Sequence, residues 1–219
     1  MTTDGYDIVE QFLRTHSFVL QNLERSISSP HTGDLIRKYF TISKTTDITT
    51  GRNVSNITAY DDCPVWVLLE CLTFGDLLEF YSFYAKSRSI PLPAQWSTLN
   101  LVRNLRNGAS HDVCLLCHLP AGNSVPSREI NLEIKKIATI STSQRQKKLS
   151  SRTLHEFAAL VYLYSLVVHG NVRLHRIDEL KDLFFNRIPE KKDFFKNNAL
   201  LVSSYQFCCE VIKNLLFIP

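Results

Sequence analysis

The sequence has no apolar run of 18 or more residues, the length that a membrane-spanning helix needs, so we expect no membrane span. Its N-terminal stretch, residues 1–16, is polar and lacks the apolar core of a secretory signal, which favours a cytoplasmic protein. Only 7 glycines and 8 prolines occur, too few for a low-complexity or collagen-like chain. A glycine-rich phosphate loop, a Ser-His-Asp order and an H-E-x-x-H motif are also missing, so the common catalytic classes that they mark are disfavoured.

Charge gives weak guidance about partners. The net charge of +4 is compatible with a polyanionic partner but does not require one. One segment is distinctly basic and carries Arg145, Lys147, Lys148 and Arg152. Such a tract is either a solvated helix face or a surface that binds RNA phosphates, and both interpretations stay open.

Cysteine usage argues against a bound metal or haem. Most of the six cysteines lie in apolar, periodic segments, which predicts reduced core thiols. Cys114, Cys117 and His118 spell the c-type haem pattern, but the chain has no export signal and its only methionine is Met1. A zinc site would need a second pair of ligands at suitable spacing. We therefore expect no cofactor and no metal.

Apolar residues recur at helical spacing along most of the chain and predict an all-α fold. A helix that starts after residues 61–64, kinks at Gly75 and runs to Arg88 is apolar nearly all round, as is one at 154–169; both belong inside a bundle. A helix at about 95–118 leaves one face for polar residues. The remaining predicted helices cover 6–27, 34–40, 128–137, 174–187 and 203–218.

Residues 41–60 are rich in Thr, Ser and Asn and show little periodicity. We interpret them as a surface loop that is mobile. Strand-like alternation of useful length is not evident, nor is an internal repeat. The sequence thus predicts a single domain over 1–219 with a mobile loop near 41–60.

The helix at 95–118 contains R-N-L-R-N-G-A-S-H, residues 103–111. Because each helical residue turns the chain by about 100°, Arg103, Asn107 and His111 share one stripe, and Arg106 lies about 140° from His111. Burying an unpaired guanidinium is costly, so this face should open onto a cleft or an interface.

These groups suit RNA transesterification. An imidazole can move the proton of the ribose 2′-OH, and a guanidinium can stabilise the charge that develops on the phosphate. The amide of Asn107 can orient either group, and the chemistry needs no metal. The alternative is structural: Arg106 pairs with an acid such as Glu70 or Asp76, and His111 is a satisfied core histidine.

Two motifs carry a resemblance to a known family. Pro64, Trp66, Glu70, Phe74 and Gly75 match P-[IV]-W-x-L-x-E-x-[LP]-[ST]-F-G-x-[LF], and residues 103–111 match R-N-x-R-N-x-x-x-H. In these motifs and in flanking segments, residues 17–165 resemble the Abi-like family of abortive-infection proteins. That family is similar to the HEPN ribonucleases, which share the motif R-[NHD]-x-x-x-H.

The resemblance implies an HEPN-like helical bundle with additional C-terminal helices. It also implies that Arg106 and His111 are catalytic and that Asn107 is the polar residue after the arginine. Residues expected to bind RNA or to orient the site are Arg103, Glu70, Asp76, Lys147 and Lys148, with surface charge as the alternative for the two acids. Many relatives carry a further histidine soon after the motif, where this chain has residues 112–116, so RNA recognition here is reduced or different.

HEPN sites usually combine one motif from each of two protomers, so a single motif implies a homodimer. We therefore expect a metal-independent endoribonuclease of bacterial anti-phage defence, with RNA as substrate and with a regulatory RNA or a cognate antitoxin as a possible partner. The alternative is a catalytically inactive HEPN module that binds RNA or a partner protein. A purely structural subunit is the third reading.

Overall fold

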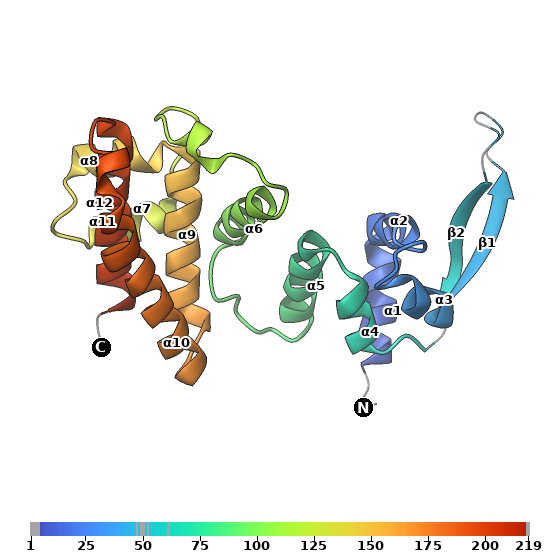
Figure 1. The fold of residues 1–219 in the computed structure, drawn as a ribbon. Coiled ribbons are helices and arrows are strands. Elements are labelled where there is room, and N and C mark those ends of the chain that lie inside the picture. Colours follow the sequence, from blue (N-terminus) through green and yellow to red (C-terminus); the bar gives the residue numbers. More distant parts are fainter. Residues whose placement is uncertain (1–4, 47, 49–50, 52, 61, 218–219) are drawn as a thin grey trace. The chain divides into compact units, whose positions relative to one another are not determined.

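The computed structural model describes residues 5–46, 48, 51, 53–60 and 62–217, which form a predominantly helical protein with a two-stranded sheet (Figure 1). The predicted helical fold class is confirmed. The chain groups into two compact units, Met1–Leu92 and Pro93–Pro219, which we describe separately; the single domain stays a prediction. Among the described residues, no helix is both long enough and apolar enough to cross a bilayer.

Helices and one hairpin build the N-terminal unit. The helices are α1 (Tyr6–Thr15), α2 (Ser17–Arg25), α3 (Gly33–Tyr39), α4 (Val65–Cys71) and α5 (Phe74–Ser87). Their apolar faces meet in one core that includes Phe12, Leu13, Leu23, Ile36 and Leu68. The helix predicted over 6–27 is two helices, because the backbone leaves helical geometry at His16, whose ring stacks on Phe12 with the centroids 4.4 Å apart.

The segment predicted as a loop contains a β-hairpin, so that prediction is wrong. Strands β1 (Phe40–Thr46) and β2 (Asn53–Tyr60) pair antiparallel and contact α3 and α2 (Figure 1). Much of the segment is threonine, isoleucine or valine, and such β-branched side chains favour strands even where they are polar. The Ile57 N–H donates to Glu24 Oε1 over 2.8 Å and fastens β2 to α2. The part of the prediction that concerns residues 47, 49–50 and 52 lies outside the described residues.

The long apolar helix predicted after Pro64 is interrupted between α4 and α5. Leu72 is extended, and the Thr73 hydroxyl accepts the backbone N–H of Asp76 over 3.2 Å, which caps the start of α5. Gly75 lies in the first turn of α5 and is not a kink. Threonine three residues before aspartate is a helix-start signal that outweighs the continuous apolar pattern here.

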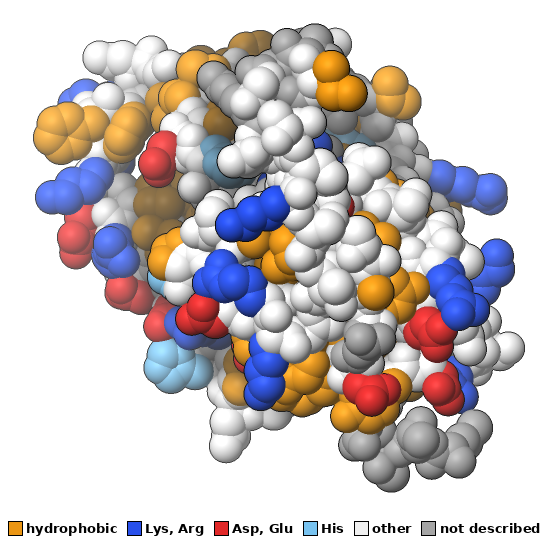
Figure 2. All heavy atoms as spheres, turned by 90° about the vertical axis from the view of Figure 1, so that its right-hand side faces the viewer, with side chains coloured by type: hydrophobic (Ala, Val, Ile, Leu, Met, Phe, Trp, Pro, Cys, Tyr) orange, Lys and Arg blue, Asp and Glu red, His pale blue; other side chains and the backbone are white. Residues whose placement is uncertain are grey.

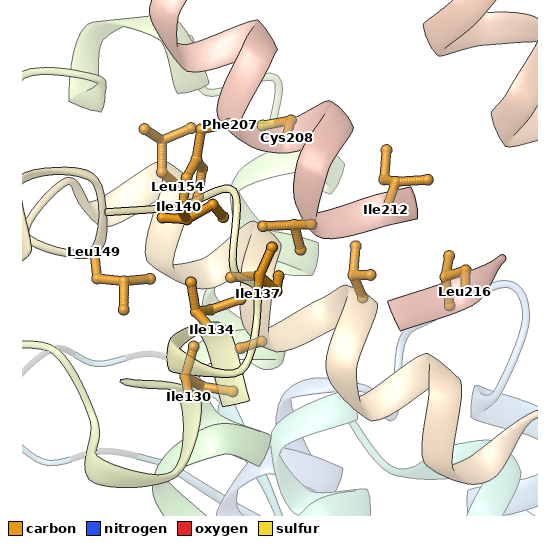
Figure 3. Close-up of a cluster of buried hydrophobic side chains, with 14 of the residues drawn as sticks. Ile130, Ile134, Ile137, Ile140, Leu149, Leu154, Phe207, Cys208, Ile212 and Leu216 are labelled. Carbon is orange, nitrogen blue, oxygen red and sulfur yellow. The ribbon is translucent and has the colours of Figure 1, made fainter. Parts of the chain in front are cut away.

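The C-terminal unit is helical throughout its regular structure. Its elements are α6 (Trp96–Ser110), η1 (Leu115–His118), α7 (Arg128–Lys135), α8 (Thr142–Leu149), α9 (Arg152–Val167), α10 (Gly170–Lys181), the π-helix η2 (Asp182–Arg187), α11 (Ile188–Glu190), η3 (Lys192–Phe194) and α12 (Ala199–Leu216). Helix α9 contacts α6, α7, α8 and α12. Ile130, Ile134, Leu149 and Ile212 are fully buried in the shared core (Figure 3). Helices were predicted in the regions of α7, α9, α10 and α12, and these are confirmed.

Helix α6 ends at Ser110, earlier than the predicted end near residue 118. Asp112 has a left-handed backbone with φ of 54°, which turns the chain, and the Val113 N–H donates to the Gly108 carbonyl over 3.0 Å. Cys114 and Cys117 therefore lie outside α6 and are exposed, so the prediction of core thiols is wrong for these two. It is confirmed for the other four, Cys63, Cys71, Cys208 and Cys209, which are buried.

Candidate active site

Helix α6 has a packed side and an open side. Leu99, Val102 and Leu105 are buried, and the helix packs against α9. These positions recur every three residues and form the packed side, and Leu101 beside them also packs against the core. Arg106 is exposed, and Arg103 and Asn107 are half-buried. The helix thus presents the charged and amide groups of the motif at its surface.

Asn107 links the other two motif residues. Its side-chain oxygen accepts a hydrogen bond from Arg106 Nη1 over 3.2 Å. Its backbone carbonyl accepts the N–H of His111 over 3.0 Å and the hydroxyl of Ser110 over 3.1 Å. Arg106 and His111 are therefore both held to the last turn of α6 through one residue.

His111 is the residue at which α6 ends, and its side chain is exposed. An exposed imidazole can exchange protons with solvent and with a bound substrate. The exposed Arg106 can bind a phosphate through two parallel N–H donors. The turn can therefore bind an anion and transfer a proton, whereas a core histidine sealed from solvent could do neither.

Asp76 and Glu70 lie in the N-terminal unit in very different surroundings. Asp76 is buried on α5, where Asn22 Nδ2 donates to both carboxylate oxygens over 2.9 and 3.0 Å and the Thr73 hydroxyl donates over 2.7 Å. Glu70 is exposed on α4. Asp76 is thus no surface charge: it joins α2 to the start of α5, and Glu70 alone of the two is open to solvent.

Lys147 and Lys148 lie on α8 beside a cavity of about 490 Å³ that α12 also lines. Lys147 is exposed. Lys148 is buried, and its ammonium donates to the hydroxyls of Ser203 over 2.8 Å and Ser204 over 3.2 Å. Burial lowers the pKa of Lys148. The basic tract is therefore not a uniform solvated face, because one of its lysines is packed against α12.

One buried histidine with polar partners was not predicted from the sequence. His155 on α9 is 1% exposed, and its Nε2 accepts the backbone N–H of Ser127 over 3.1 Å while its Nδ1 lies 2.9 Å from the Ser124 hydroxyl. Because an N–H can only donate, Nε2 carries no proton and the ring is neutral. Burial lowers the pKa of His155 to about 4. Its apolar helix gave no signal of these partners, which lie about thirty residues earlier in the chain.

The described residues contain no group of three or more His, Cys, Asp or Glu side chains that could hold a metal ion. On the face drawn in Figure 2, lysine and arginine side chains are interspersed with acidic and hydrophobic ones. Any anion bound on that face would therefore meet local clusters of charge rather than one broad basic surface.

Fold and site together define a predominantly helical protein with arginine, asparagine and histidine at the exposed end of one helix. The family model for Abi-like proteins matches residues 3–116, just over half of the chain, and the chain belongs to this family. The match includes α6 with its motif and begins and ends earlier than the span of 17–165 expected from the sequence. Comparisons with curated proteins and with solved structures gave no match.

Proposed function

We propose that this Abi-like protein is a cytoplasmic, metal-independent endoribonuclease of the HEPN type that acts in abortive infection, where it cuts RNA and halts growth. The observation that carries the proposal is the last turn of α6, where Arg106 donates to Asn107 over 3.2 Å and His111 ends the helix with its imidazole exposed. Family membership supports the biological role.

In the proposed reaction the ribose 2′-oxygen attacks the adjacent phosphorus, and the bond to the 5′-oxygen breaks. His111 takes the proton from the 2′-OH or supplies one to the leaving 5′-oxygen. Arg106 binds the phosphate oxygens and stabilises the charge of the pentacoordinate transition state. Asn107 positions the guanidinium. The products carry a 2′,3′-cyclic phosphate and a 5′-hydroxyl.

One imidazole cannot act as base and acid at the same moment, and Arg106 lies about 140° around the helix from His111. A second copy of α6 brought up by a two-fold axis would supply the missing groups. We therefore propose a homodimer with a composite site, in which each protomer contributes Arg106 and His111.

The test is cleavage of single-stranded RNA by the purified protein in the presence of EDTA. His111→Ala and Arg106→Ala should each lower the rate at least about 100-fold, since each removes a group that acts in the transition state. His175→Ala is the matched control, because His175 is an exposed histidine on α10. Circular dichroism should show unchanged folding in all variants.

The outcomes separate the alternatives. RNA that is bound but left intact by the unmutated protein would favour a binding module that uses the same residues. Cleavage that EDTA abolishes would contradict the metal-independent mechanism. Equal cleavage rates for the His111→Ala and His175→Ala variants would mean that His111 takes no part in the reaction.

The dimer has its own test. When a fixed amount of unmutated protein is mixed with excess His111→Ala protomer, most active protomers will pair with inactive ones, and activity should fall. Excess His175→Ala protomer should instead add activity. Activity that is unchanged by the His111→Ala protomer, under conditions where the two exchange, would mean that each chain works alone.

A further inference from the structure

Cys114 and Cys117 differ from the other cysteines of the chain because both are exposed. Cys114 directly precedes the short helix η1, and Cys117 is its third residue. The two cysteines follow the end of α6 and its motif by a few residues. Neither thiol has a role in the proposed cleavage of RNA.

The backbone holds the two cysteines at the spacing of a disulfide. The Cys117 N–H donates to the Cys114 carbonyl over 3.1 Å and closes a tight turn. Residues i and i+3 of such a turn have α-carbons less than about 7 Å apart, and disulfides span about 4.4–6.8 Å. Their side chains also interact, since each thiol shifts the pKa of the other.

This interaction makes the two thiols unequal. Interaction with the Cys117 side chain lowers the pKa of the Cys114 thiol, and the same interaction raises the pKa of Cys117. The thiolate is the nucleophile in disulfide exchange, so Cys114 is the attacking group and Cys117 the resolving one.

The turn is fastened to its surroundings between the two cysteines. The Leu115 carbonyl accepts the hydroxyl of Thr153 on α9 over 2.7 Å. A Cβ at Gly108 would lie 3.0 Å from Leu115 Cδ2, so Leu115 packs closely on the last turns of α6. A turn held in this way keeps the sulfurs near each other and reduces the entropy lost when they bond.

We propose that Cys114 and Cys117 form a reversible dithiol–disulfide site that exchanges with low-molecular-weight disulfides. The Cys114 thiolate attacks one sulfur of the small disulfide, forms a mixed disulfide and releases one thiol. Cys117 then loses its proton, attacks the Cys114 sulfur and releases the second thiol. Two electrons pass from the cysteine pair to the small disulfide, which becomes two thiols.

The experiment uses the full chain and glutathione as the probe. The protein is equilibrated at a series of ratios of oxidised to reduced glutathione, free thiols are blocked with an alkylating agent, and the modified cysteines are identified by mass spectrometry. Oxidising ratios should remove alkylation at Cys114 and Cys117 together, with the loss of two hydrogens, and reducing ratios should restore it. RNA is not involved, so this result and the nuclease assay fail independently.

Variants assign the order of the steps. Cys117→Ser should stop at a stable glutathione adduct on Cys114, and Cys114→Ser should react several-fold more slowly at Cys117. Cys208→Ala changes a buried thiol and should leave the exchange unaltered. Full alkylation of both residues at every ratio, or disulfides between chains instead of within one, would overturn the site. Faster reaction of Cys117 than of Cys114 in the single variants would overturn the assigned roles.

Discussion

Arg106 and Asn107 are consecutive residues whose side chains are joined by a hydrogen bond of 3.2 Å from the guanidinium Nη1 to the amide Oδ1. On a helix, consecutive side chains point about 100° apart, so this bond draws the guanidinium back toward the stripe that Asn107 shares with Arg103 and the end of α6. The bond thereby fixes the guanidinium of Arg106 on the side of α6 that carries Asn107.

This relationship predicts that Asn107→Ala lowers kcat/KM for RNA cleavage by about 10- to 100-fold, the effect of losing a hydrogen bond to a charged group. The free energy of unfolding should change by less than about 1 kcal/mol, because Asn107 is only half-buried. Asn100→Ala is the control, since Asn100 lies on the same helix and its side chain donates to the Trp96 carbonyl over 3.0 Å. Equal activity of the two variants would mean that the bond has no part in positioning Arg106.

A second prediction contrasts the two acids of the N-terminal unit. Asp76→Ala should lower the free energy of unfolding by about 2–3 kcal/mol, because it removes a buried carboxylate that accepts hydrogen bonds from Asn22 and Thr73. Glu70→Ala should change it by less than about 0.5 kcal/mol, because Glu70 is exposed. Urea unfolding of both variants measures the difference. A stable Asp76→Ala protein would show that the network contributes little to the fold.

The sequence predicted the helices well where one apolar face persists for several turns. Helix α9 and helix α12 have such faces, and both form within a few residues of the predicted ends. The predictions failed at two places: where a capping threonine interrupts an apolar segment, and where a polar segment forms strands. Thr73 starts a new helix inside an apolar run. The polar segment Phe40–Thr46 forms a strand because it pairs antiparallel with Asn53–Tyr60 across a hairpin.

The candidate site was only partly accessible to sequence reasoning. Spacing alone placed Arg106, Asn107 and His111 on one helix, because that relationship is local, but the end of the helix at Ser110 was not predicted. The partners of Lys148 and His155 come from residues 203–204 and 124–127, and only the tertiary fold brings them together. The exposure of Cys114 and Cys117 depends on the left-handed Asp112, a backbone conformation that the apolar spacing of this segment concealed.

Lys148 gives a third prediction. Its ammonium is buried with two serine hydroxyls as partners, and the buried charge costs free energy that these neutral groups only partly offset. Lys148→Met keeps most of the side-chain volume and removes the charge, so the free energy of unfolding should stay within about 1 kcal/mol or rise. Lys148→Ala should lower it by about 1–3 kcal/mol, because it also removes buried methylenes. If both variants were destabilised to the same extent, the ammonium of Lys148 and not the packing of its methylenes would provide the stability.

The fourth prediction concerns pH and His155. Burial lowers the pKa of this histidine from 6.5 to about 4, so the unfolded chain binds a proton between these values and the folded protein does not. Stability from this group is therefore complete above pH 6.5 and is lost as the pH falls toward 4, by about 3 kcal/mol in all. His155→Gln should be less stable than the unmutated protein near pH 7 but should lack this loss. Urea unfolding at intervals from pH 7 to 4 measures both curves.

The comparison of the two curves isolates His155 because the carboxylates, Glu210 among them, are present in both proteins. Thr139 hydrogen-bonds to Glu210 and lowers the pKa of its carboxyl, so both proteins also lose stability from that group at the acidic end. The difference between the two free energies of unfolding should therefore shrink steadily below pH 6.5, because only the unmutated protein loses the stability that comes from the neutral His155. Parallel curves would mean that His155 takes up its proton inside the folded protein, and the hydrogen bond from the Ser127 N–H to Nε2 could not then hold the ring neutral.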